Sequence, residues 1–335
     1  MSVNYFLKRL LMAIPTLLGV AIIVFVLLRV VPGDPVAMMI GPEATQLDIE
    51  RLRAFYGLDK SIVEQFGLFL GNAFIGDFGT SISYKQDVME LVLGHLPSTL
   101  ELTFFAIFMG VLFGLFLGTS AVYWKGSWPE AVVDGINGLT IAIPDFLWAL
   151  LLILFFAVLV PVLPVSGRLD PSLSLKFDTN FYLIESIFRG NFNTAGIIFK
   201  HMLLPGFALA LPLTAVISRV LKTSLVEAMS QDYILLVQVK GFERGWVLFR
   251  HALPNALIPT ITLSGVQFMF LVGGTVLIEL IFAYPGIGNM AVSAVINRDL
   301  PLIQGITLIF AVLFIFLNLL IDLSYVFLNP RVRNE

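Results

Sequence analysis

Residues 102–122 read LTFFAIFMGVLFGLFLGTSAV, an unbroken run of 21 residues without a charged side chain. A helix of about 20 apolar residues is long enough to cross the hydrocarbon core of a bilayer. The run therefore predicts a transmembrane helix. Across the whole chain of 335 residues, 58% are hydrophobic and 13% are charged, whereas soluble domains average about 45–50% and about 25%. This composition excludes a soluble globular protein.

Five further apolar runs of similar length occur along the chain. They lie at residues 10–30, 136–160, 202–220, 258–280 and 302–328. Prolines in or beside these runs, such as Pro144, predict bent helices, because proline lacks a backbone N–H. The sequence therefore predicts an all-α integral membrane protein with six transmembrane helices.

The charges beside the outermost runs predict the orientation in the membrane. Six spans place both termini on one side, and Lys8, Arg9, Arg331 and Arg333 lie at those two ends. Positive flanks face the cytoplasm, so both termini are predicted to be cytoplasmic. The net charge of −3 provides no basic surface for a nucleic-acid partner.

The two long loops on the opposite side differ in their patterns. After the first span, Thr45 with Asp48 and Ser61 with Glu64 have the spacing of capping boxes, which predicts two short helices. The second loop, 161–200, shows no clear period and is expected to be irregular.

Gly110, Gly114 and Gly118 recur at intervals of four in the quoted run. This spacing places all three on one face of a helix, where a second helix backbone can approach closely. We interpret them as helix-packing residues and not as substrate contacts.

Acidic residues are scarce in the predicted spans. Glu101, Asp145, Glu279 and Asp322 lie near span ends, and none occupies a clear midpoint. Ion-coupled transporters usually carry ionisable groups deep in the membrane, so this pattern disfavours them. Asp145 and Glu279 are the candidates for the translocation path or for gating. The alternative for each is a helix-end residue that contacts headgroups, water or a neighbouring backbone.

Common catalytic patterns are absent from the sequence. No lysine directly follows a glycine, which excludes the phosphate-binding pattern G-x-x-x-x-G-K-[ST], and no histidine begins an H-E-x-x-H. No serine lies between glycines at both −2 and +2, and cysteine is missing. We expect no catalytic residues, no metal and no cofactor on this chain.

The segment between the fourth and fifth spans contains a predicted amphipathic helix. Phe242, Trp246, Phe249 and Leu253 are spaced 4, 3 and 4 residues apart, so they fall on one helix face. Such a ridge can lie in the headgroups or fit the groove of a soluble partner. Composition alone leaves both alternatives open.

The sequence resembles a known family in and around this segment. Gly241 precedes Leu253 and Pro254 with the spacing of the "EAA" loop of ATP-binding-cassette (ABC) importer permeases. Along almost its whole length the chain resembles the dipeptide and oligopeptide permease subunits of the DppB/OppB type. The matching stretches include LLMAIPTLLGV at 10, VVPGDPV at 30, GDFGTSI at 76, LPSTLEL at 96, LPVSGR at 163, RHALPNALIP at 250, IELIFAYPGIG at 278, NRDLP at 297 and NPRVR at 329.

Two departures from the family pattern stand out. The family usually carries Ala-Arg-Ala-Lys-Gly before the loop, whereas this chain has Val-Gln-Val-Lys-Gly ending at Gly241. The family also more often has Phe-Trp after the proline at 144, where this chain has Asp145 followed by Phe-Leu-Trp. The first departure affects packing against an ATPase. The second leaves two alternatives for Asp145, which either tunes the substrate or is a helix-end residue.

The resemblance implies a fold and a set of partners. It implies the six-helix type I importer permease fold in a bacterial inner membrane. The expected parts are a first helix with a long outer loop (1–95), an ABC type-1 transmembrane permease domain (96–328) and a short cytoplasmic tail (329–335). The expected partners are a homologous second permease, two ABC ATPase subunits that bind ATP and Mg²⁺, an external substrate-binding protein and the lipid bilayer.

The resemblance also implies roles for the segment between the fourth and fifth spans. Phe242, Trp246, Phe249 and Leu253 would face the ATPase, Gly241 would permit the turn, and Pro254 would end the helix. The ridge could instead face the permease's own helices.

A self-sufficient secondary transporter or channel is the main alternative function, and a membrane-embedded enzyme is the second.

The substrate stays open among dipeptides, oligopeptides, glutathione, nickel chelates, opines and sugars. A peptide is the leading expectation.

Overall fold

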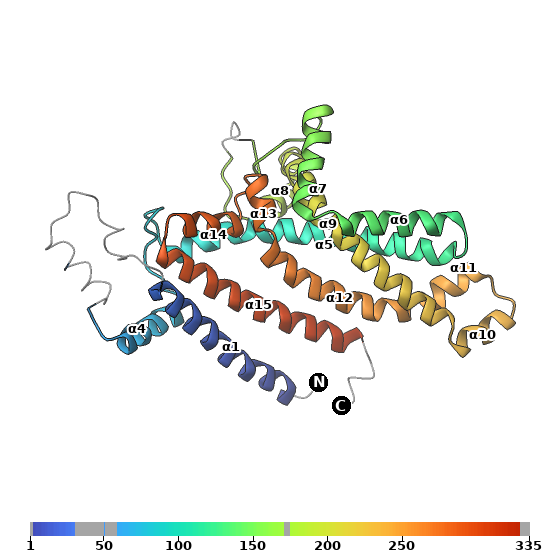
Figure 1. The fold of residues 1–335 in the computed structure, drawn as a ribbon, viewed down its shortest axis with the longest axis horizontal. Coiled ribbons are helices and arrows are strands. Elements are labelled where there is room, and N and C mark those ends of the chain that lie inside the picture. The colour runs from blue at the N-terminus through green and yellow to red at the C-terminus, as the bar shows by residue number, and fades with distance from the viewer. Residues whose placement is uncertain (1–2, 31–49, 51–58, 171–174, 329–335) are drawn as a thin grey trace. The chain divides into compact units, whose positions relative to one another are not determined.

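The computed structural model describes residues 3–30, 50, 59–170 and 175–328. The regular structure of this part of the chain is helical apart from one isolated bridge between Thr80 and Asp87 (Figure 1). The chain divides into two compact units. One comprises Pro97–Asn289 with Leu317–Glu335, and the other comprises Ser2–Leu96 with Met290–Phe316.

Long apolar helices dominate the described residues. Four of these helices are long and apolar enough to cross a membrane: α5 (Val88–Tyr123), α9 (Phe192–Met229), the continuous helix Arg244–Gly274, and Leu300–Ile321 within α15 (Leu300–Leu328). The first predicted span coincides with α1 (Val3–Val30), whose described apolar portion is shorter. The prediction of an all-α membrane fold is confirmed.

The predicted span at 136–160 is a bent pair of helices. α6 (Trp128–Ala142) and α7 (Asp145–Ile153), which continues as a π-helical turn (Leu154–Leu159), meet at 101°. Ile143 is extended at the break (φ −94°, ψ 122°) because the following Pro144 disfavours helical geometry at the residue before it. The indole N–H of Trp148 donates to the carbonyl of Thr140 across the break at 3.3 Å. The bend is therefore fixed on both sides of the proline.

The expectation of an irregular segment over 161–200 is wrong for its second half. α8 (Tyr182–Phe188) forms there, and α9 begins at Phe192, ten residues before the predicted span. The side chain of Asn191 accepts a hydrogen bond from the backbone of Thr194 and caps α9. A seven-residue helix is too short to reveal a period in the sequence, and the cap lies outside the apolar run that defined the span.

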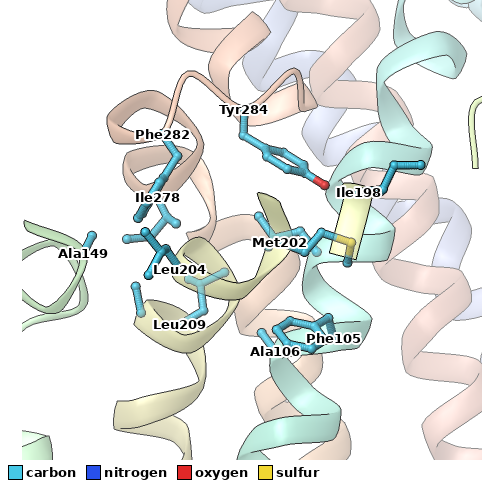
Figure 2. Packing of buried hydrophobic residues seen from close by; sticks show 12 residues of the cluster. Phe105, Ala106, Ala149, Ile198, Met202, Leu204, Leu209, Ile278, Phe282 and Tyr284 are labelled. Atoms are coloured by element: carbon cyan, nitrogen blue, oxygen red, sulfur yellow. The ribbon is translucent and has the colours of Figure 1, made fainter. Parts of the chain in front are cut away.

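α9 is the centre of the larger unit. It packs on α6, α7, α8 and α12 (Leu253–Gly274), and it runs through Pro205 and Pro212 without ending. Buried side chains from α5, α9 and the turn that follows α13 (Val276–Ile281) meet in one apolar cluster (Figure 2).

α5 approaches α9 closely at the three glycines within residues 102–122. A Cβ added to Gly110 would lie 2.6 Å from the Leu213 side chain, and one added to Gly114 would lie 2.7 Å from Ile217. At Gly118 it would lie 2.8 Å from the carbonyl oxygen of Ser218. Any side chain here would separate the two helices, since real Cβ atoms essentially never come within 3.0 Å of such neighbours.

The smaller unit contains α1 and α4 (Ile62–Phe74). Ser61 and Glu64 form the predicted capping box at the start of α4, with both hydrogen bonds present. The ring of Phe25 on α1 contacts Phe66 and Phe69 on α4, with centroids 5.0 Å and 5.8 Å apart. The other predicted capping box, Thr45 with Asp48, lies outside the described residues.

A buried carboxylate organises the rest of the smaller unit. Asp299 accepts hydrogen bonds from the hydroxyl of Ser81 at 2.6 Å and from the backbone N–H of Ser83 at 2.9 Å. It also accepts from the N–H of Leu302 in the first turn of α15. The stretches GDFGTSI and NRDLP, far apart in the sequence, therefore meet at this residue.

Candidate functional site

The segment between α9 and α12 folds as a compact layer on the end of α9. It comprises α10 (Asp232–Val239), α11 (Arg244–Val247) and a π-helical turn (Leu248–Ala252) that leads directly into α12. Ile234, Val247 and Leu248 are buried against Leu221 and Leu225 of α9. The apolar side of this segment is therefore held by the permease itself.

Three aromatic side chains of the same segment remain outside that cluster. The ring of Trp246 stacks on Phe242 with centroids 4.4 Å apart and makes an edge contact with His251. Phe242, Trp246 and Phe249 are 46%, 45% and 56% exposed, and we call these three residues the aromatic patch. Gly241 precedes the patch with φ at +85°, a left-handed conformation that glycine adopts without strain.

Leu253 and Pro254 differ from their predicted roles. The π-helical turn has more residues per turn than an α-helix, as the bond from the N–H of Leu253 to the carbonyl of Leu248 shows. Leu253 consequently leaves the line of the aromatic patch and packs against the buried cluster. Pro254 does not end a helix, because it lies directly after the π-helical turn, within the continuous helix Arg244–Gly274.

Polar and close contacts attach this segment to the neighbouring elements. The guanidinium of Arg244 donates to the carbonyl of Val122 on α5 at 3.2 Å. A Cβ on Gly245 would lie 3.1 Å from the ring of Tyr123, so the two chains approach closely there. The aromatic patch therefore sits on a layer that is fixed to α5 and α9.

Glu279, on α13, is enclosed by hydrogen-bond donors. The hydroxyls of Thr99 and Thr275 donate to its Oε1 at 2.7 Å and 3.0 Å, and the backbone N–H of Asn289 donates to its Oε2 at 2.9 Å. The N–H of Ile287 in turn donates to the hydroxyl of Thr99 at 2.9 Å. The carboxylate thus joins α5, α13 and the first turn of α14 (Ile287–Ile296).

Glycines make room for this carboxylate. A Cβ on Gly286 would lie 2.3 Å from the carboxylate of Glu279, and one on Gly288 would lie 2.9 Å from its Oε2. Glu279 is fully buried. These contacts are those of a junction between helices, and Glu279 does not line the cavity beside Asp145 described next.

Asp145 lies at the break between α6 and α7. One of its carboxylate oxygens accepts the N–H of Phe146 at 2.8 Å. The residue lines a cavity of about 290 Å³ together with residues of α9 and α12. The two candidate acids are therefore in different environments. The side chain of Asp322 lies outside the described residues.

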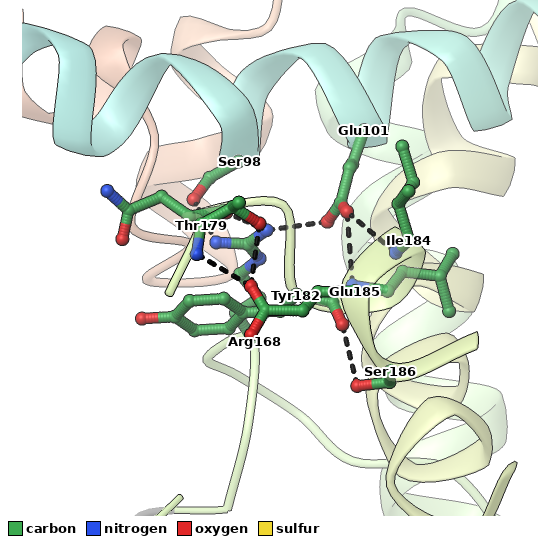
Figure 3. A network of polar contacts seen from close by, with 10 residues as sticks. Ser98, Glu101, Arg168, Thr179, Tyr182, Ile184, Glu185 and Ser186 are labelled. Carbon is green, nitrogen blue, oxygen red and sulfur yellow. Dashed lines mark hydrogen bonds and ion pairs between the residues drawn. The ribbon is translucent and has the colours of Figure 1, made fainter. Parts of the chain in front are cut away.

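Sequence reasoning assigned no role to a polar cluster between α5 and α8, shown in Figure 3. Arg168 donates to Glu101 at 2.5 Å, to the hydroxyl of Ser98 at 2.7 Å and to the carbonyl of Asn180 at 2.7 Å, and it lies over the ring of Tyr182. The Glu101 and Arg168 side chains are almost fully buried. Glu101 lies in the stretch LPSTLEL and Arg168 in LPVSGR, and both stretches resemble the family. This resemblance was the sequence signal that pointed to both residues.

A second carboxylate holds the loop next to this cluster. Glu185 accepts hydrogen bonds from the N–H groups of Asp178 and Thr179 and from the Thr179 hydroxyl, and it pairs with Arg189. Burial acts to raise the pKa of Glu185, but these hydrogen bonds and the charge of Arg189 outweigh it, so its pKa is lower than usual. The loop before α8 is therefore stabilised by an ionised carboxylate.

Comparison with known proteins identifies the family to which these features belong. Residues 110–334 match the family described as "Binding-protein-dependent transport system inner membrane component". The chain belongs to this family. Residues 2–103 match the N-terminal component that carries the description "Binding-prot-dependent transport system membrane comp, N-term".

Full-length relatives and solved structures agree with this membership. The dipeptide transport system permease protein DppB of Alkalihalophilus pseudofirmus is 35% identical over 329 residues, with 98% of this chain and 99% of the relative covered. The glutathione transport system permease protein GsiC of Escherichia coli (strain K12) is 35% identical over 330 residues, with the same coverage. A structure of the MetNI methionine ABC transporter shares the fold, with a TM-score of 0.53 at 18% identity over 72% of this chain and 97% of that chain.

Several expectations from the sequence are thereby confirmed. The chain is a multi-pass permease of the inner membrane and a component of a binding-protein-dependent ABC importer. Its relatives are transport permease subunits, so the chain is a transport subunit and not an enzyme.

Proposed function

We propose that this permease is half of the membrane pathway of an ATP-driven importer whose cargo is a di- or oligopeptide. Its partners would be a homologous second permease, two ABC ATPases that bind ATP and Mg²⁺, and an external protein that delivers the peptide. Both termini and the segment 230–252 would face the cytoplasm. The proposed direction of transport is inward.

The observation that carries this proposal is the aromatic patch. Three large aromatic side chains of this segment are exposed, and two of them, Phe242 and Trp246, stack on each other, although the segment has a buried cluster of its own. Exposed aromatic residues on a rigid support are typical of the centres of protein interfaces. A surface of this kind suits the binding of an ATPase whose conformational changes are transmitted to the permease in every transport cycle.

The helix that follows the patch provides a mechanical connection. Residues Arg244–Gly274 form one continuous helix of 31 residues, which is about 45 Å long at about 1.5 Å per residue. Trp246 lies near one end, and Gln267 and Gly274 line the cavity near the other. Movement of an ATPase at Trp246 would therefore displace one wall of that cavity.

The names of the relatives support a peptide as cargo. One relative is a dipeptide permease and another a glutathione permease, and glutathione is itself a small peptide. The identity to both is 35% over nearly the whole chain. We propose the shared chemical class, a short peptide, as the cargo.

Reconstitution in proteoliposomes tests the function as a whole. Uptake of radiolabelled alanyl-leucine and of glutathione would be measured with this chain alone and with its second permease, ATPases and binding protein. We expect uptake only with the complete set and ATP. Uptake by the chain alone, driven by an ion or solute gradient, would overturn the proposal in favour of a self-sufficient transporter.

Two adjacent residues test the docking surface. Trp246 is exposed and Val247 is fully buried, so Trp246→Glu should abolish ATP hydrolysis stimulated by the loaded binding protein while the subunit accumulates normally. Val247→Glu should prevent accumulation, because it buries a charge in the cluster. Trp128→Glu, at an exposed aromatic residue of α6, is the matched control. A Trp246→Glu subunit that fails to accumulate would assign Trp246 to the permease core instead.

A further inference from the structure

The break between α6 and α7 opens a cavity inside the larger unit. Its volume is about 290 Å³, near the lower end of the roughly 300–1,000 Å³ of small-molecule sites. Pro144 and Asp145 line it from the break, Pro212 and Val216 line it from α9, and Gln267 and Phe270 line it from α12. Three elements far apart in the sequence therefore line one open cavity.

The walls of the cavity are apolar except for two side chains. Asp145 contributes a carboxylate and Gln267 an amide. Within residues 59–170 and 175–328, the Asp145 carboxylate has a hydrogen bond only from its neighbour Phe146 and forms no ion pair. The Gln267 amide makes no hydrogen bond to any described residue. Both groups are available to a ligand.

A carboxylate in these surroundings selects a particular chemistry. A charged side chain within or near a membrane span is costly and is typically retained where it pairs with a partner. Asp145 attracts a cation and repels an anion. An amide beside it can accept from an N–H or donate to a carbonyl. The apolar walls accommodate a hydrocarbon side chain next to that charge.

A short peptide carries this combination of groups at its amino terminus. It has an ammonium group, and next to it a side chain and the first peptide carbonyl. We propose that the cavity is a transient binding site for the amino-terminal end of a peptide substrate, in which Asp145 receives the ammonium group and Gln267 the first peptide unit. This inference rests on the proposed function and deepens it.

The same cavity is placed to release its occupant when the ATPases act. Gln267, Phe270 and Gly274 belong to the helix that begins at Arg244, next to Trp246. Phe270, at the edge of the cavity, is 69% exposed. Displacement of this helix would move Gln267 away from Asp145 and separate the two polar contacts. Weak binding by only two groups suits a site that a substrate must leave again.

Asp145→Asn tests the charge in the complete reconstituted importer. The wild-type complex must first show ATP-dependent uptake of alanyl-leucine or glutathione, and failure at that step would count against the proposed function. With transport established, we expect Asp145→Asn to lower uptake by about tenfold or more. ATP hydrolysis stimulated by the loaded binding protein should stay within about twofold of wild type, because docking is unchanged. Asp145→Glu should restore part of the uptake.

Substitutions at two neighbouring glycines test whether uptake needs the open space of the cavity. A Cβ on either Gly273 or Gly274 meets no atom within 4 Å, but only Gly274 lines the cavity. Gly274→Leu should therefore reduce uptake, and more strongly for a peptide with a bulky first side chain than for alanyl-leucine. Gly273→Leu should leave uptake unchanged.

One joint outcome of the two tests would contradict the inference. Unchanged uptake per ATP hydrolysed in both Asp145→Asn and Gly274→Leu, in a complex whose wild type transports, would overturn the inference while leaving the proposed function intact.

Discussion

Glu279 and Asp145 are the same kind of group in two different settings. Glu279 is fully buried and accepts hydrogen bonds from Thr99, Thr275 and Asn289. Asp145 accepts one hydrogen bond, from the residue next to it, and borders a cavity. A carboxylate that several protein donors enclose stabilises the fold, whereas one with free lone pairs is available for a ligand.

The difference comes from the neighbouring backbone. Glycines at 286 and 288 let the chain wrap closely around Glu279, with no room for a side chain. At Asp145 the chain instead turns away by 101° after Pro144, and space is left. A closed turn and an open break therefore give different surroundings to two acids that look alike in the sequence.

Removal of the enclosed carboxylate should have the largest effect. Glu279→Ala leaves the hydroxyls of Thr99 and Thr275 and the N–H of Asn289 without their acceptor, at about 1–3 kcal/mol for each buried donor. We expect the subunit to accumulate poorly and to unfold at a much lower temperature in detergent. Glu279→Gln, which keeps one acceptor oxygen, should lie between. A wild-type unfolding temperature for Glu279→Ala would contradict this assignment.

Filling the space around an acid should have the next largest effect on stability. We expect this effect beside Glu279 and not beside Asp145. Gly286→Ala would bring a methyl group to 2.3 Å from the Glu279 carboxylate, which should cost about 1–3 kcal/mol as overpacking. Gly274→Ala, beside Asp145, meets no atom within 4 Å and should leave the unfolding temperature unchanged. Equal stability of the two variants would remove the distinction between a closed and an open site.

Glu185 provides an intermediate case that responds to pH. Its pKa is lower in the folded protein than its usual value of 4.5, so its stabilising contribution is fully present above about 4.5 and is lost as the pH falls through the lower folded value. We expect the protection factors of the Asp178 and Thr179 amides, which compare the observed exchange with the intrinsic rate at each pH, to fall over that acidic range. In Glu185→Gln the same amides should exchange faster at neutral pH and show less change on acidification. Identical profiles in the two proteins would exclude Glu185 as the titrating group.

The smallest effect on stability should follow the loss of the open carboxylate. Asp145→Leu removes one hydrogen bond to an adjacent N–H and places an apolar side chain beside apolar walls. We expect the unfolding free energy to stay within about 0.5 kcal/mol of wild type, measured by thermal unfolding of the assembled complex. A large loss of stability would mean that Asp145, like Glu279, is part of the fold.

Local sequence patterns predicted much of the architecture. The run at 102–122 lies within α5, and the spacing of Ser61 and Glu64 predicted the cap of α4. The four-residue interval of Gly110, Gly114 and Gly118 predicted one helix face, and that face lies against α9. Each of these patterns depends on residues within a few turns of one helix, and so the sequence alone can reveal it.

Patterns failed where the helix itself changed its geometry. The predicted ridge assumed 3.6 residues per turn from Phe242 to Leu253. The π-helical turn at Leu248–Ala252 altered that spacing, so Leu253 packs against the buried cluster, and Pro254 lies inside a continuous helix instead of ending one. The packing of Val247 and Leu248 against α9 accompanies this turn, and the local sequence does not show it.

The sequence by itself determined that this protein resides in a membrane, that it is built of helices, and which family it resembles. Apolar length and helical period are local properties, and family stretches are read directly from the chain. Only the tertiary structure decided which carboxylate is enclosed and which is open. The donors to Glu279 include Thr99, 180 residues away in the sequence, and the walls beside Asp145 come from α9 and α12. Burial and partnership depend on segments that folding brings together, and they set the role of a charged group in a membrane protein.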